Sequence, residues 1–110
     1  MTEQRRNPRY SFIASAELLE PQTDVRIATR VSELSLHGCY MDMLNPFPVD
    51  TVVLAKISSG DAEFRTNAKV IYAHPNFGAG MVFLDPEPQY LKILNDWISA
   101  AAKDPDRLVK

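Results

Sequence analysis

The sequence predicts a mainly β protein in which six antiparallel strands form a small barrel or sandwich, followed by one C-terminal helix. Two observations support this prediction. Apolar residues alternate with a period of two through most of the chain, and turn-forming residues recur between the alternating stretches. Only near the end does the apolar spacing become helical. The 110 residues, 45% of them hydrophobic and 24% charged, allow one folded domain with a modest core.

Each predicted strand is bounded by turn signals, among them "PQTD", "LNPFPVD", "SSGD" and "PNFG". In chain order, the strands cover residues 10–20, 25–35, 39–43, 51–57, 63–74 and 79–85. Alternate apolar residues define the core-facing side of a strand. On that side we expect Tyr10, Phe12, Ala14, Ala16 and Leu18 in the first strand, Cys39, Met41 and Met43 in the third, Phe64, Thr66, Ala68, Val70 and Tyr72 in the fifth, and Ala79, Met81 and Phe83 in the sixth.

The second strand changes phase along its length. Its first apolar residues, up to Val31, share one parity, whereas Leu34 and Leu36 have the opposite parity. A bulge or sharp bend near Ser32 would let both sets face one core, and such irregularities often lie beside binding sites. After this strand, Gly38 can turn the chain with a positive φ at low cost.

The predicted helix begins after the sixth strand. Asp85 is a good N-cap, Pro86 suits the first helical position, and Glu87 favours the positive end of the helix dipole. An apolar face with helical spacing follows, made of Leu91, Leu94 and Ile98 with Trp97 beside them. We expect the helix to end near Lys103 and a charged tail to occupy residues 104–110.

The positive charge of the chain is local. The net charge is −2, which argues against broad binding to duplex DNA or to an anionic membrane. Within residues 1–10, however, Arg5, Arg6 and Arg9 oppose only Glu3, so the segment carries 3 − 1 = +2. Residues 1–9 are therefore predicted to be a flexible arginine-rich arm that precedes a folded unit over residues 10–103. Such a local positive charge favours binding of a small anion over binding of a long polyanion.

A second polar motif lies in "ELSLHG", where Glu33 and Ser35 are two residues apart and are predicted to share one strand face. A carboxylate there can accept hydrogen bonds from N1–H and the exocyclic amine of guanine, and the hydroxyl can donate to a phosphate. Arginine forks, such as those of Arg5 and Arg9, match phosphate oxygens and the O6/N7 edge of guanine. Together the two motifs predict a ligand with guanine-like edges and phosphates.

These motifs resemble those of the PilZ domain. "RRNPR" contains Arg-x-x-x-Arg, "ELSLHG" resembles [Asp/Asn]-x-Ser-x-x-Gly, and "FGAGMVFLD" resembles the usual sixth strand of the family. The resemblance covers nearly the whole chain. It implies a six-stranded antiparallel PilZ-type β-barrel with a C-terminal α-helix, and cyclic di-GMP as the ligand. The binding residues would be Arg5, Arg6, Arg9, Glu33, Ser35 and Gly38.

Glu33 departs from the family pattern because it stands where Asp or Asn is usual. The extra methylene shifts the carboxylate oxygens by about 1 Å, and a misplaced charge-assisted hydrogen bond can cost roughly 1.5–3 kcal/mol. Retained and lost nucleotide binding therefore both stay open. The leading prediction is a bacterial, cytoplasmic cyclic di-GMP receptor whose arm becomes ordered on binding and signals to a protein partner of unknown identity or to a second copy of the chain. The alternative is a PilZ-like protein-interaction module that has lost the nucleotide.

Other functions find less support in the residues. A single-stranded nucleic-acid barrel needs a basic groove with exposed aromatics, whereas most strand aromatics here have core phase. An enzyme is not predicted, because the sequence has no nucleophile elbow, phosphate loop or metal triad. No catalytic residue, metal or cofactor is expected. A membrane-spanning segment is not expected either, since no long apolar stretch occurs. Cys39, the only cysteine, is expected to be a buried thiol.

Overall fold

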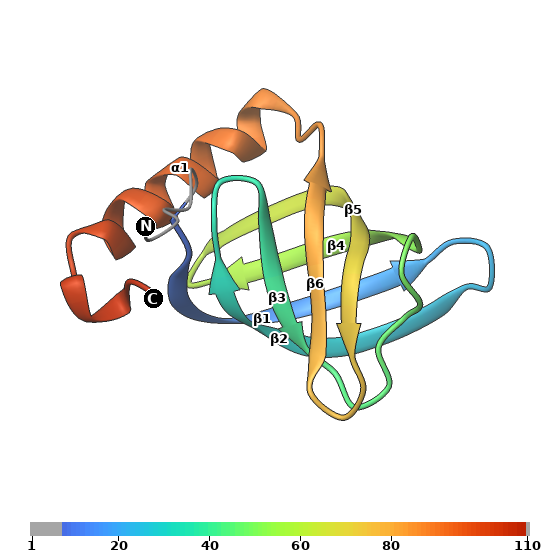
Figure 1. Ribbon diagram of the computed structural model, residues 1–110. Coiled ribbons are helices and arrows are strands. Elements are labelled where there is room, and N and C mark those ends of the chain that lie inside the picture. Colours follow the sequence, from blue (N-terminus) through green and yellow to red (C-terminus); the bar gives the residue numbers. More distant parts are fainter. Residues whose placement is uncertain (1–7, 110) are drawn as a thin grey trace.

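The six strands close into an antiparallel barrel in the order β1-β2-β3-β6-β5-β4 (Figure 1). The computed structural model describes residues 8–109 of the chain. The strands are β1 (Tyr10–Glu20), β2 (Val25–Leu34), β3 (Gly38–Asp42), β4 (Val52–Ser59), β5 (Ala62–His74) and β6 (Gly78–Leu84). The ladder between β4 and β1 completes the ring, so each of these strands pairs with a neighbour on both sides. The predicted six strands are confirmed, and the choice between barrel and sandwich is settled as a barrel.

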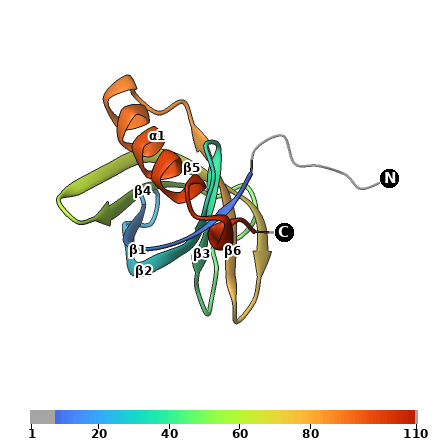
Figure 2. The same cartoon turned by 90° about the vertical axis from the view of Figure 1, so that its left-hand side faces the viewer.

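Alternate side chains of every strand fill the interior of the barrel. The largest fully buried side chains are Leu18, Val31, Leu34, Met41, Val53, Ile57, Phe64, Val70, Met81 and Leu94. Helix α1 (Pro88–Ala102) covers the end of the barrel where β1 and β5 begin (Figure 2). The ring of Trp97 lies 5.2 Å from Phe12 and 6.5 Å from Phe64, measured between centroids. The apolar face of the helix therefore closes the core at this end.

Two irregularities in the strand pairing change which residues face the core. The pairing of β2 with β3 shifts between Val31 and Glu33, so the predicted bulge near Ser32 is confirmed, and Leu34 is buried as expected. Leu36 was expected to face the core as well, but it lies beyond the end of β2 and is exposed. The prediction for Leu36 was wrong because the strand alternation stops at Leu34.

A second shift, between Val70 and Tyr72 of β5, corrects the prediction that Tyr72 faces the core. Val70 pairs with the buried Met81, but the next pair is Tyr72 with Gly80, which lies on the outer face of β6. The extra residue, Ile71, is accommodated as a bulge and reverses the parity of the positions after it. Tyr72 is consequently on the outside of the barrel.

The helix begins two residues later than predicted. Its first residue is Pro88 and its N-cap is Glu87, which has an extended backbone with φ −65° and ψ 150°. A residue before proline is disfavoured in the helical region, so Glu87 cannot belong to a helix that continues into Pro88. Asp85 is not the cap, because it has a left-handed backbone with φ 47° and turns the chain out of β6. The prediction for Asp85, Pro86 and Glu87 was therefore wrong in position.

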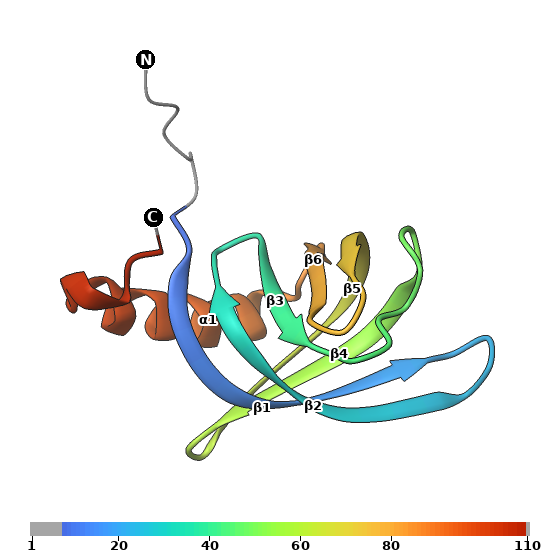
Figure 3. The same cartoon turned by 60° about the horizontal axis from the view of Figure 1, so that its bottom comes forward.

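The C-terminal end returns to the start of β1 (Figure 3). A short 3-10 turn, η1 (Pro105–Arg107), follows the helix. Leu108 then forms an antiparallel bridge with Tyr10, and the backbone N–H of Val109 donates to the carbonyl oxygen of Arg9 at 2.8 Å. Residues 104–110 were predicted as a charged tail; within them, the described residues hold the backbone where β1 begins.

The thiol of Cys39 gives a simple test of the core. It is buried, and this burial raises its pKa to about 12. At pH 8 almost all of the thiol is therefore protonated, whereas the thiolate is the form that reacts. We expect the folded protein not to react with a thiol reagent at pH 8, and to react fully once urea unfolds it. Rapid labelling of the folded protein would contradict this burial.

Candidate ligand-binding site

Of the three predicted arm arginines, Arg9 is the one that the structure describes, and its side chain reaches across the outer face of the barrel. Its Nη1 lies 3.5 Å from Oε1 of Glu33 on β2 and donates a hydrogen bond of 3.3 Å to the hydroxyl of Tyr72 on β5. The side chains of Arg9 and Glu33 are each 31% exposed. One guanidinium thus connects two strands that are not neighbours in the barrel. Arg5 and Arg6 lie outside the described residues.

The Arg9–Glu33 pair leaves hydrogen-bonding capacity unused. Within residues 8–109, Nε of Arg9 and Oε1 of Glu33 are buried atoms without a hydrogen-bond partner. Buried polar groups in folded proteins are nearly always paired, so each such atom requires an explanation. Here one is a donor on a cation and the other is an acceptor on a carboxylate. A ligand that carries both an anionic oxygen and an N–H group would satisfy both, provided that the Arg9 and Glu33 side chains turn apart to admit it.

Ser35 lies in the tight turn between β2 and β3 and not on the strand, which corrects the predicted shared face with Glu33. Its hydroxyl oxygen accepts hydrogen bonds from the backbone N–H groups of His37 and Gly38 at 3.3 and 3.1 Å. The hydroxyl also donates to the carbonyl oxygen of Gly38 at 3.2 Å. Ser35 is 7% exposed, so it fixes the shape of the turn in addition to bordering the site.

Gly38 is required for a different reason from the one predicted. Among the described glycines, only Gly60 has a positive φ. A Cβ on Gly38 would instead lie 2.1 Å from the carbonyl oxygen of Met81, on the neighbouring strand β6. The lack of a side chain therefore allows the turn and β6 to approach closely, and the expected positive φ of Gly38 was wrong.

The motif residues converge on one pocket of about 230 Å³ on the outside of the barrel. Its lining includes Arg9, Ser35, His37, Gly38, Tyr72 and Gly80. Glu33 joins this group through its ion pair with Arg9. The Arg9 guanidinium and the second motif, more than twenty residues apart in the sequence, thus lie together on the outer face of the barrel.

The sequence did not reveal that Tyr40, Tyr72 and His74 gather beside this pocket. Their ring centroids are 5.1 to 6.2 Å apart, and the rings of Tyr40 and Tyr72 lie over the two glycines of β6, Gly78 and Gly80. Partial burial raises the pKa of the Tyr40 phenol, and the nearby Tyr72 raises it further. The sequence does contain one indication of this cluster, namely Gly78 and Gly80 within β6, because glycine inside a strand often marks a close approach of another group.

Sequence comparison matches residues 3–100 to the PilZ domain. The chain belongs to the PilZ family. The match includes residues 3–9 of the arm and every strand of the barrel. A comparison with curated protein sequences found no match.

Solved structures with the PilZ fold resemble this chain closely in shape but not in sequence. The PilZ domain of YcgR from Escherichia coli, solved with c-di-GMP, superposes with a TM-score of 0.73 at 15% identity, covering 92% of this chain and 93% of that one. The PilZ domain of CeSA from a cellulose-synthesizing bacterium gives 0.69 at 16% identity, covering 84% and 95%. The Bacillus subtilis inhibitor of motility, MotI/DgrA, gives 0.74 at 13% identity; the match covers 94% of this chain but 53% of that protein.

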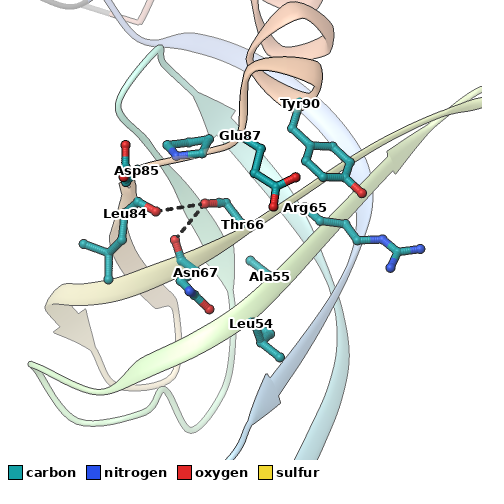
Figure 4. A pocket seen from close by; sticks show the side chains of 10 residues that line it. Leu54, Ala55, Arg65, Thr66, Asn67, Leu84, Asp85, Glu87 and Tyr90 are labelled. Atoms are coloured by element: carbon teal, nitrogen blue, oxygen red, sulfur yellow. Dashed lines mark hydrogen bonds between the residues drawn. The ribbon is translucent and has the colours of Figure 1, made fainter.

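This PilZ domain has a second depression, of about 330 Å³, where β4, β5 and β6 meet the start of α1 (Figure 4). Polar side chains there include Arg65, Asn67 and Glu87, with Tyr90 from the helix beside them. The buried hydroxyl of Thr66 is satisfied by the carbonyl oxygens of Asn67 and Leu84. None of the predicted site residues that the structure describes lines this depression, so it is separate from the pocket lined by Arg9, Ser35 and Gly38.

Neither a metal site nor a membrane-spanning helix occurs within residues 8–109 of the PilZ domain. No cluster of three or more His, Cys, Asp or Glu side chains in this range could hold a metal ion. His37 and His74 are on different elements, the β2–β3 turn and the end of β5. No helix in the same range has the length and apolar character needed to cross a bilayer.

Proposed function

We propose that this PilZ domain is a non-enzymatic receptor for cyclic di-GMP. The observation that carries the proposal is the convergence of Arg9, Glu33, Ser35 and Gly38 at one site, where Arg9 Nε and Glu33 Oε1 make no hydrogen bond. Cyclic di-GMP offers two phosphodiesters and two guanines. Its phosphate oxygens match Arg9 Nε, and the guanine N1–H and amine match Glu33 Oε1. The YcgR structures solved with c-di-GMP, similar in fold, add support.

The signal would pass through the arm. In this proposal Arg5 and Arg6 join Arg9 around the ligand, so that residues 1–9 become ordered against the barrel. Ordering of the arm then changes the surface that meets a protein partner or a second copy of the chain. A cytoplasmic location, where a nucleotide second messenger is available, is part of the same proposal.

Isothermal titration calorimetry of the purified chain with cyclic di-GMP tests the proposal. We expect saturable binding at micromolar concentrations. Cyclic di-AMP is the matched control ligand, because it keeps both phosphodiesters but lacks the guanine N1–H. A site whose carboxylate accepts a hydrogen bond from this N–H rejects an analogue that lacks it, so we expect at least tenfold weaker binding. No heat of binding with cyclic di-GMP at high micromolar concentrations would reject receptor function.

A second candidate is a PilZ-like interaction module without nucleotide binding. The observation that favours it is the engagement of the Arg9 guanidinium by Glu33 and Tyr72, which a phosphate would have to displace. This candidate expects a partner protein to bind equally well with and without cyclic di-GMP. Partner binding that depends on the nucleotide would reject it.

Glu33→Asp distinguishes the two candidates. Removing one methylene withdraws the carboxylate from Arg9 and restores the usual family residue. If the natural site is a working receptor, we expect Glu33→Asp to bind cyclic di-GMP no more tightly than the parent and up to about a hundredfold more weakly, because the carboxylate oxygens retreat by about 1 Å from a ligand that Glu33 already reaches. The measurement is calorimetry on both forms. A gain of tenfold or more, about 1.4 kcal/mol, would indicate that Glu33 had suppressed binding and would favour the interaction module.

A further inference from the structure

Three aromatic side chains form a surface feature that the motif residues do not explain. Tyr40 on β3 and Tyr72 and His74 on β5 lie on the outer face of the barrel, on either side of β6 (Figure 1). The ring centroids of Tyr72 and His74 are 5.1 Å apart, and the ring of Tyr40 lies 6.2 Å from Tyr72 and 6.1 Å from His74. We call these three residues the aromatic ledge.

Strand register places the aromatic ledge in line with the motif site. Glu33 pairs with Tyr40 across β2 and β3, Tyr40 pairs with Gly80, and Gly80 pairs with Tyr72. The two ends of this row, Glu33 and Tyr72, are the residues that Arg9 contacts. A planar base whose edge is bound by Glu33 would therefore extend over the neighbouring strand, where Tyr40 lies.

The glycines of β6 make room for these rings. A Cβ on Gly80 would lie 2.2 Å from Cζ of Tyr72, and a Cβ on Gly78 would lie 2.7 Å from Cε1 of Tyr40. The rings thus rest against the backbone of β6 with no side chain beneath them. They are still accessible to solvent, since Tyr40 and Tyr72 are half-buried and His74 is exposed. Tyr40 and His74 are also linked within the group, since the phenol oxygen of Tyr40 lies at a hydrogen-bond distance of 3.4 Å from Nδ1 of His74.

The size of the pocket supplies the remaining argument. At about 230 Å³, the motif pocket is smaller than the roughly 300–1,000 Å³ of sites that enclose drug-sized ligands. A cyclic dinucleotide bound there must extend over the adjoining surface. Tyr72 both lines the pocket and belongs to the aromatic ledge, so the ledge is the surface on which the ligand would continue.

We infer that the aromatic ledge is a stacking subsite for one purine base of the bound cyclic dinucleotide, with Tyr40 under the base whose edge meets Glu33. This inference rests on the proposed receptor function. Stacking on an aromatic ring is tolerant of base identity, because every base has a π-face. The ledge therefore adds affinity, and recognition of guanine is left to the carboxylate and the guanidinium.

The test compares Tyr40→Leu, Tyr40→Phe and the control Phe77→Leu. Leucine removes the aromatic face, phenylalanine keeps it, and Phe77 is an exposed aromatic residue outside the ledge. We expect Tyr40→Leu to weaken cyclic di-GMP binding about tenfold, and the other two variants to bind within about twofold of the parent. In NMR spectra, the guanine H8 proton should show cross-peaks to the Tyr40 ring protons. Thermal unfolding of each variant checks that the barrel is intact.

Each result decides between the two proposals. Weakened binding in Tyr40→Leu alone, with the H8 cross-peaks, supports the stacking subsite. Unchanged binding in Tyr40→Leu, or absence of the cross-peaks in a saturated parent complex, overturns the subsite and leaves the receptor function standing. If the parent chain itself fails to bind cyclic di-GMP, both the receptor function and the subsite are rejected.

Discussion

Arg9→Ala is expected to weaken cyclic di-GMP binding by about a hundredfold. The guanidinium carries the unpaired Nε donor of the site and connects Glu33 to Tyr72. Its loss removes charge-assisted hydrogen bonds to phosphate, which are worth roughly 1.5–3 kcal/mol each. Calorimetry measures the effect directly. Arg9→Lys keeps the charge but not the planar fork, so we expect it to lose about tenfold.

Arg26→Ala is the matched control for this variant. Arg26 is an exposed arginine on β2, paired with Leu19 near the β1–β2 turn and away from the motif pocket. We expect the Arg26→Ala protein to bind cyclic di-GMP as tightly as the parent does. If the ligand were held only by non-specific attraction of an anion to positive charge, Arg9→Ala and Arg26→Ala would lose affinity equally. The Arg9–Glu33 pair is partly exposed and contributes little to stability, so Arg9→Ala should unfold at nearly the parental temperature. A folded Arg9→Ala protein with undiminished affinity would show that the phosphates bind elsewhere.

Gly38→Ala is expected to destabilise the fold by about 2–3 kcal/mol and to impair the site as well. The new Cβ would lie 2.1 Å from the carbonyl oxygen of Met81, and backbone cannot move aside as the end of a flexible side chain can. Forcing extra volume into a packed position typically costs 1–3 kcal/mol. The strain would separate β3 from β6 beneath the pocket and disturb the two N–H bonds that Ser35 accepts. Urea unfolding and calorimetry measure the two effects.

Gly60→Ala separates this crowding from backbone strain. Gly60 has a φ of 59°, and a Cβ added there would meet no atom within 4 Å, so alanine at this position is strained but not crowded. We expect a loss of about 1 kcal/mol and unchanged ligand affinity, since a left-handed conformation costs a non-glycine residue roughly 1–2 kcal/mol. Equal losses in stability at Gly38 and Gly60, with binding intact in both, would contradict the role given to Gly38.

Much of the barrel follows from alternation, because each strand has one face in the core and one towards solvent. The first strand, residues 10–20, has the predicted bounds. The phase change in β2 also revealed its bulge, because Leu34 could not otherwise reach the core. The bulge in β5 is not accompanied by a comparable change of parity in the sequence. Tyr72 has the parity expected of a core residue, and an aromatic ring can occupy either side of a strand.

The candidate site was predictable only as a set of motifs. The sequence identified Arg9, Glu33, Ser35 and Gly38 by type and order, and the structure brings them together. The aromatic ledge could not be predicted, because it depends on which residues of β3, β5 and β6 lie opposite one another. Register is a property of the whole barrel, and a shift of one residue moves a side chain to the other face.

The hydrogen bond between Val109 and Arg9 has a practical consequence for any assay of this protein. Leu108 and Val109 support the backbone of the arginine assigned to the phosphates, although they stand at the opposite end of the sequence. A purification tag fused directly to this end, or a truncation before Leu108, would therefore disturb the position of Arg9. Affinities from such preparations should be compared with those of an untagged chain before any loss is ascribed to Glu33.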